Sequence, residues 1–172
     1  MRVRLSRQEM ANCEQAAALR WQLARASGVT NQRKDKGRSD ADLDLIGIKA
    51  ETAVAKVLDV HHNVFQMGVD SGADMFLGNI SIDVKSTFYE SGKMLFKSLD
   101  AFRADCCVLV TATQDADVMN VAGYSSKAHF EKNAETADLG HGPCFIMTQD
   151  RLRGIESLWA YHKTITLDNG TT

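Results

Sequence analysis

The sequence predicts a mixed α/β domain in which helices flank a central sheet. Two long N-terminal segments carry apolar residues at helical spacing, and the pattern then changes to short strands. A two-residue hairpin signal, Gly78-Asn79, lies between two of those strands. The length of 172 residues favours one domain. We divide it into an N-terminal helix with a basic loop (1–39), a core (40–162) and a tail (163–172).

Two helices are expected first. Ser6 and Glu9 have the spacing of a capping box, so the first helix should cover about residues 6–26. A second helix should reach from about residue 40 to residue 58, capped by Ser39 or by the residue after it. Its apolar stripe consists of Leu43, Ile46, Ala50, Val54 and Val57. A mid-helix glycine costs stability, so Gly47 suggests close packing at that point.

The segment between these helices is a predicted loop that is rich in turn formers and positive charge. Its basic residues outweigh the single Asp35, and they are Arg33, Lys34, Lys36 and Arg38. Such a loop is either a solvated connection or an arm that contacts phosphates.

Further strands are expected at Val64-Phe65, over CCVLVTA from Cys106, over VMNVAGY from Val118 and over CFIM from Cys144. The continuous apolar run from Cys106 is typical of a buried central strand. Ser125 or Ser126 can start a short helix that reaches about Lys132. Thr148 can cap a final helix with Leu152, Ile155 and Trp159 on one face.

The hairpin raises a question of charge. Gly at the first central position suits a type II′ turn, which fixes the register so that Leu77 faces Ile80. The same register places Asp74 opposite Asp83. Alternation then puts Ser81, Asp83 and Lys85 on one face of the sheet. Like charges that lie directly opposite are destabilising, unless one is protonated or a cation binds between them.

Two interpretations of this cluster remain open. Lys85 can neutralise the carboxylates, which would leave a surface salt bridge. Alternatively, Asp74 and Asp83 hold Mg²⁺, with the carbonyl of Val84 as a third oxygen. A bound metal would lower the pKa of a water molecule and polarise a phosphate. Lys85 would then orient that water or stabilise charge on the phosphoryl oxygens.

The pattern Gly47-x-x-x-Glu51, then Asp74, then Asp83-Val84-Lys85 resembles the PD-(D/E)xK nuclease superfamily over about residues 40–161. That superfamily includes phage nucleases and Holliday-junction resolvases. The resemblance implies a restriction-endonuclease-like αβββαβ core, here with an extra N-terminal helix. It implies that Asp74 and Asp83 are metal ligands, that Lys85 is the catalytic lysine, and that Glu51 is an auxiliary ligand of metal or water.

The sequence departs from the superfamily pattern at two points. Ala73 stands where the name of the motif has proline. No Gln-x-x-x-Tyr follows in a later helix, which disfavours the RecB-like exonuclease branch.

The expected function is therefore a Mg²⁺- or Mn²⁺-dependent deoxyribonuclease, acting as an endonuclease. DNA is the expected partner, and Ser86 and Thr87 are further candidates for phosphate contact alongside the basic loop. The sequence leaves open a homodimer. One alternative is a catalytically inactive nucleic-acid-binding module on the same fold. Another is a structural α/β protein whose hairpin charges only pair on the surface.

Composition restricts the other classes of protein to which the chain could belong. A hydrophobic share of 44% and a charged share of 24% are ordinary for a globular protein. The net charge of −2 does not indicate a nucleic-acid binder, and it does not exclude one, because a local basic surface can serve. No apolar run approaches the roughly 20 residues of a membrane span, and no secretory signal is evident. The four cysteines form no CxxC pair, so we expect reduced thiols in a cytoplasmic protein.

Overall fold

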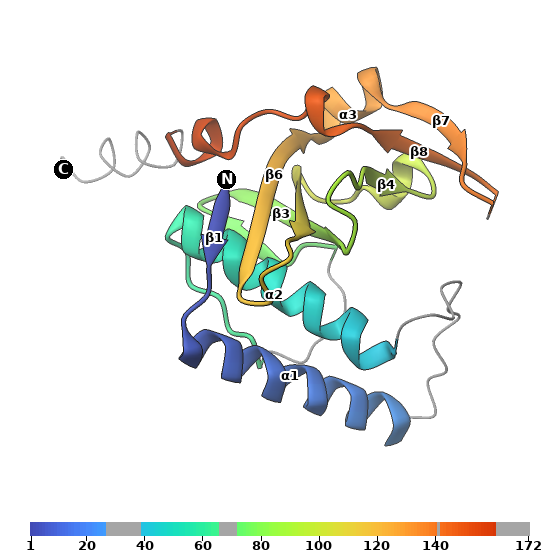
Figure 1. The fold of residues 1–172 in the computed structure, drawn as a ribbon. Helices are drawn as coiled ribbons and strands as arrows, with labels where there is room; N and C mark the ends of the chain where they lie inside the picture. The colour runs from blue at the N-terminus through green and yellow to red at the C-terminus, as the bar shows by residue number, and fades with distance from the viewer. Residues whose placement is uncertain (27–38, 66–71, 141, 161–172) are drawn as a thin grey trace.

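The computed structural model describes residues 1–26, 39–65, 72–140 and 142–160, and it contains two sheets (Figure 1). The larger is a curled, mixed five-stranded sheet in the order β1-β6-β5-β3-β2, and the smaller has three strands in the order β4-β8-β7. The strands of the larger sheet are β1 (Arg2–Arg4), β2 (Met75–Leu77), β3 (Ile80–Thr87), β5 (Cys106–Ala112) and β6 (Val118–Ser126). Those of the smaller are β4 (Met94–Phe96), β7 (Glu135–Asp138) and β8 (Pro143–Met147). The predicted α/β class is confirmed.

Three helices have complete bounds, namely α1 (Arg7–Ala26), α2 (Asp40–Leu58) and α3 (Lys127–Asn133). Helix α2 lies on the larger sheet, and α1 packs on the far side of α2 (Figure 1). The predicted caps of these three helices are present, whereas Thr148 makes no capping hydrogen bond through its side chain. Ser6 and Glu9 exchange hydrogen bonds at the start of α1, and Ser39 caps α2 in a capping box with Asp42. Ser126 caps α3 through the backbone N–H of His129.

The core has two layers because each face of the larger sheet is covered. Facing α2 are Ile82, Val108 and Val110, which pack with Ala50 and Val54 of the helix. The opposite face presents Cys107 and Leu109 to the aromatic cluster Phe96, Phe102 and Phe130. Both faces of β5 are thus buried, which explains its continuous apolar run. Burial of each large aliphatic side chain contributes about 1.5–3 kcal/mol.

The hairpin register is confirmed. Leu77 pairs with Ile80, Phe76 with Ser81 and Met75 with Ile82. Gly78 has φ +59°, as the first central position of the predicted turn requires. Strand β3 then pairs with β5 in parallel, and the connection between them contains β4 and a 3₁₀ turn (Leu99–Ala101).

Some predictions were wrong. Val64 and Phe65 lie in a turn rather than a strand, and no sequence pattern had indicated β1, β4 and β7. Each of these strands has only three or four residues, too few for a periodic signal. The close packing suggested for Gly47 is also wrong, because a Cβ there would meet no atom within 4 Å. Leu43 of the predicted stripe is 37% exposed, so the buried part of the helix face begins at Ile46.

The predicted final helix is interrupted. After Thr148 the chain makes a 3₁₀ turn (Gln149–Arg151), then extends, and residues 155–160 are helical. Arg153 forms two backbone hydrogen bonds of 2.9 Å with Tyr124, which hold it in an extended conformation. Gly123 permits this approach, because a Cβ at that position would lie 2.6 Å from the carbonyl oxygen of Arg153. This contact between distant segments overrides the local helical preference.

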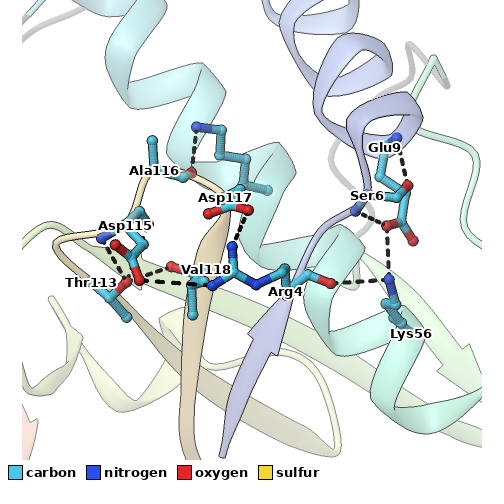
Figure 2. Close-up of polar contacts among 10 residues, drawn as sticks. Arg4, Ser6, Glu9, Lys56, Thr113, Asp115, Ala116, Asp117 and Val118 are labelled. Atoms are coloured by element: carbon cyan, nitrogen blue, oxygen red, sulfur yellow. Dashed lines mark hydrogen bonds and ion pairs between the residues drawn. The ribbon is translucent and has the colours of Figure 1, made fainter.

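Polar contacts tie the first strand to α2 and to the β5–β6 turn (Figure 2). The guanidinium of Arg4 binds Asp117 and lies 3.9 Å from Asp115. Lys56 of α2 donates to the carbonyl of Arg4 at 3.1 Å and to Glu9 at 2.8 Å. These exposed ion pairs add little stability individually. They join β1 to the β5–β6 turn and α1 to α2.

All four cysteines are free and buried. Among the residues that the structure describes, no helix has the length and apolar character needed to cross a membrane.

Candidate functional site

The candidate site lies where the two hairpin strands part. Their paired ladder ends at Met75 and Ile82, while β3 continues to Thr87. Asp74 lies just outside β2, and its backbone N–H donates to the carbonyl of Ile82 at 2.8 Å. Its carboxylate turns toward β3, where Oδ2 accepts the backbone N–H of Val84 at 2.6 Å. A side chain thus takes the place of a backbone acceptor at the end of the ladder.

This geometry corrects the expected pairing of Asp74 with Asp83. The ladder stops one pair short of it, so the two residues are not regular cross-strand partners. The carboxylates are nevertheless close. Burial raises the pKa of Asp74 to about 6; the N–H of Val84 opposes this shift, and the charge of Asp83 and a hydrogen bond with its carboxyl reinforce it. A carboxylate whose charge is disfavoured by a second carboxylate beside it is part of a site that a cation would stabilise.

Asp83 and Lys85 form a close ion pair on the face of β3 that carries the aromatic cluster. The Nζ atom of Lys85 lies 2.7 Å from Oδ2 and 2.8 Å from Oδ1 of Asp83. The Asp83 side chain is 12% exposed, whereas that of Lys85 is 42% exposed. Burial favours the neutral amine, but the carboxylate of Asp83 outweighs it, so the pKa of Lys85 is raised. Nζ also lies 5.4 Å from the ring centroid of Phe96, within reach of a cation–π contact.

Glu51 of α2 belongs to the same electrostatic cluster. Its side chain is only 13% exposed. Burial raises its pKa to about 7, the charges of Asp74 and Asp83 add to the shift, and Arg20 opposes it. The guanidinium of Arg20 lies 3.7 Å from Oε2 of Glu51, and Nε2 of His62 lies 3.4 Å from the same oxygen.

Sequence reasoning missed the part played by Arg20 and His62, because two adjacent histidines after a helix are usually exposed. The His62 side chain is 9% exposed. Burial lowers its pKa, and the charge of Arg20 adds to that shift, so the neutral ring is favoured. Its Nε2 is buried and has no hydrogen-bond partner among the described residues. No sequence signal could have found this cluster, since its members come from α1, α2 and the segment after α2.

The remaining candidates divide into two groups. Ser86 and Thr87 end β3 and pair with Val110 and Thr111 of β5, so they follow Lys85 on the same strand. The Thr87 hydroxyl accepts the N–H of Tyr89 at 3.2 Å. The basic-loop residues Arg33, Lys34, Lys36 and Arg38 lie outside the described residues.

In the described part of the chain, no group of three or more His, Cys, Asp or Glu side chains is placed to hold a metal ion. Glu51 contacts Arg20 and His62 instead of completing a ligand set with the two aspartates. The ligands that fit a cation are therefore Asp74 and Asp83, with the carbonyl of Val84, the residue that follows Asp83. One or two carboxylates completed by water and substrate oxygens are usual for Mg²⁺.

No protein-family model matches the chain, and comparisons with curated proteins and with solved structures also gave no match. The resemblance to the PD-(D/E)xK superfamily therefore depends on the motif residues alone.

Proposed function

We propose that the protein is a divalent-cation-dependent nuclease that hydrolyses internal phosphodiester bonds of DNA. The observation that carries the proposal is the position of Asp74, whose carboxylate binds the Val84 N–H beside the Asp83–Lys85 ion pair. Two neighbouring carboxylates and a lysine thus gather at the point where a hairpin opens. Hydrolysis of a phosphodiester needs these groups, namely anionic oxygens for a cation and a positive charge for the phosphoryl oxygens.

Asp74 and Asp83 would hold Mg²⁺ or Mn²⁺, which lowers the pKa of bound water and polarises the phosphate. The other contributions to hydrolysis come from the protein's own residues. Lys85 is an ammonium group, because Asp83 raises its pKa. It is therefore suited to stabilising negative charge on the phosphoryl oxygens, and less suited to removing a proton. The Val84 N–H holds the carboxylate of Asp74 in place.

Glu51 has a different part in this mechanism. With a pKa of about 7 it is poised to exchange a proton near neutral pH. Arg20 and His62 approach its carboxylate from other segments, to 3.7 and 3.4 Å. Glu51 would therefore order or deprotonate a water molecule next to the two aspartates.

A second candidate function is a nucleic-acid-binding module without hydrolytic activity. One observation favours it: both oxygens of Asp83 already contact Lys85. A cation would have to compete with this ion pair for Asp83. The two candidates differ in whether bound DNA is cleaved when a divalent cation is present.

Incubation of the protein with supercoiled plasmid tests the proposal. We expect conversion to nicked and linear forms in Mn²⁺ and none in EDTA. Asp74→Asn should abolish the conversion, whereas Asp138→Asn, an exposed aspartate in the smaller sheet, should leave it unchanged. An equal loss in both variants would indicate a general effect of substitution, and equal activity in both would indicate a contaminating nuclease. DNA binding without metal-dependent cleavage would favour the inactive module.

A further inference from the structure

Phe76 is an exposed aromatic side chain on the edge strand that leads from the candidate site. It is 60% exposed, whereas its neighbours Met75 and Leu77 are 4% and 2% exposed. Phe76 pairs with Ser81, and residues two apart share a face, so its ring lies on the same face as the side chains of Asp83 and Lys85. Burial of such a ring would contribute about 1.5–3 kcal/mol. The ring of Phe76 nevertheless does not belong to the buried aromatic cluster on this face of the sheet.

Arg103 lies beside the chain that leads into the same site. A Cβ at Gly72, which has φ +82°, would lie 2.9 Å from Cβ and 3.0 Å from Cδ of Arg103. The Arg103 side chain therefore runs against the backbone two residues before Asp74. It is exposed, and no ion-pair partner of Arg103 is present among the described residues. A guanidinium in this position is available for an anion.

Hydrogen bonds between Asp105 and Ser81 bring the segment that contains Arg103 to the edge of the sheet that carries Phe76. Asp105, two residues after Arg103, accepts the backbone N–H of Ser81 at 2.9 Å and its hydroxyl at 2.6 Å. Ser81 is the cross-strand partner of Phe76. An uncovered ring of β2 and an exposed arginine of the segment before β5 thus both belong to chain segments that adjoin the candidate site.

We propose that Phe76 and Arg103 form a subsite for an unpaired nucleotide of DNA, next to the phosphate that the carboxylates and Lys85 would receive. Phe76 stacks on the base, and Arg103 pairs with the adjoining phosphate. The substrate class is therefore DNA with single-stranded nucleotides at the cleavage point, because in an intact duplex each base face is already stacked on its neighbours. This inference rests on the proposed function, since it specifies the substrate of the same site.

The test measures binding in EDTA, where no cleavage interferes. A fluorescein-labelled single-stranded 20-mer of DNA is compared with the duplex of the same sequence. We expect Phe76→Ala to weaken binding of the single strand roughly tenfold, within the range known for loss of one stacked base, with little change for the duplex. Phe76→Trp should retain binding, because it keeps a stacking face. Leu139→Ala, which removes a side chain that is 55% exposed in another part of the molecule, should have no effect.

Arg103 is tested through salt dependence. If Arg103→Gln removes one bound phosphate, the log–log slope of single-strand binding should fall by about 0.7. Lys132→Gln on α3 should leave the slope unchanged. Thermal melts check that each variant is folded, which is expected because all four altered side chains are exposed.

The outcomes separate the two proposals. Absence of single-strand binding by the wild type, wild-type affinity in Phe76→Ala, or an equal loss for single strand and duplex would overturn the subsite. Phe76-dependent binding of the single strand, combined with no cleavage in Mn²⁺, would support the subsite and overturn the nuclease. Suppose instead that the wild type cleaves plasmid and that Phe76→Ala binds and cuts single strands normally. That result would support the nuclease and overturn the subsite.

Discussion

Asp74 accepts the backbone N–H of Val84 at the point where β2 and β3 separate, with 2.6 Å between the nitrogen and Oδ2. The bond directs the Asp74 carboxylate across the opening of the hairpin toward Asp83. It also favours the ionised form of Asp74, although burial and the charge of Asp83 outweigh it. A carboxylate held in this way is stable only with a compensating positive charge, which a divalent cation, a proton or Lys85 can supply.

Replacement of Asp83 by Asn should reveal the repulsion. In EDTA near neutral pH, Asp83→Asn should be as stable as the wild type or more stable, because one of two like charges is removed while the shape is kept. In Mn²⁺ the wild type should be the more stable of the two. A ligand that binds only the folded state adds about 2.7 kcal/mol at a hundredfold excess over Kd. The wild type should gain this and the variant much less.

Thermal melts in EDTA and in Mn²⁺ measure both effects. If the wild type does not respond to Mn²⁺ and Asp83→Asn is clearly less stable in EDTA, Asp83 serves only as the partner of Lys85. The cation site would then be excluded.

Lys85→Ala should reduce cleavage by about 100-fold or more, the usual cost of losing a group that stabilises developing charge. The fold and the response to Mn²⁺ should remain, because Lys85 is assigned to the phosphate and not to the metal. Quenched time courses on plasmid measure the rate. Lys93→Ala, another exposed lysine, is the matched control. A wild-type rate in Lys85→Ala would remove this lysine from the mechanism.

The pH dependence of stability follows from the raised pKa values of Asp74, about 6, and Glu51, about 7. In the unfolded chain both groups have ordinary, lower pKa values, so between these limits the folded state binds more protons. The unfolding free energy of the metal-free protein should therefore fall as the pH rises from about 4 to about 7.5. The total change should be on the order of a few kcal/mol.

Glu51→Gln should flatten the upper part of this decline and should be more stable than the wild type at pH 8. Urea unfolding at several pH values in EDTA provides the measurement. If Glu51→Gln shows the same pH dependence as the wild type, the pKa of Glu51 is not raised by folding.

Two glycines make a matched pair for backbone effects. At Gly123, φ is +149° and a Cβ would lie 2.6 Å from the carbonyl oxygen of Arg153. Gly123→Ala should therefore cost about 1–3 kcal/mol, because it strains the backbone and displaces the segment paired with Tyr124. At Gly47 a Cβ meets no atom within 4 Å, so Gly47→Ala should stabilise the helix by about 0.5–1 kcal/mol. Equal effects in chemical denaturation would contradict the close approach at Gly123.

The basic loop remains a prediction from the sequence. Neutralisation of Arg33, Lys34, Lys36 and Arg38 together should weaken duplex binding and reduce the log–log salt slope by about 0.9 for each phosphate that the loop no longer binds. Anisotropy titrations at several salt concentrations measure the slope. An unchanged slope would mean that the loop only connects α1 to α2.

The sequence alone determined those parts of the protein that depend on near neighbours. The Ser6 and Ser39 caps act over three residues, and Gly78-Asn79 sets the hairpin register through one turn. Such signals were readable because local hydrogen bonds and backbone preferences produce them. The same register indicated that Asp74, Asp83 and Lys85 would gather.

Only the tertiary structure decided what those groups contact. It turned Asp74 to the Val84 N–H, interrupted the final helix at Arg153, and buried His62 against Glu51. It also placed Arg103 beside Gly72. Each of these contacts joins segments that are not neighbours in a single helix or in the paired part of a hairpin. Their geometry is set by how α1, α2 and the sheets pack, and packing leaves no periodic mark in the sequence.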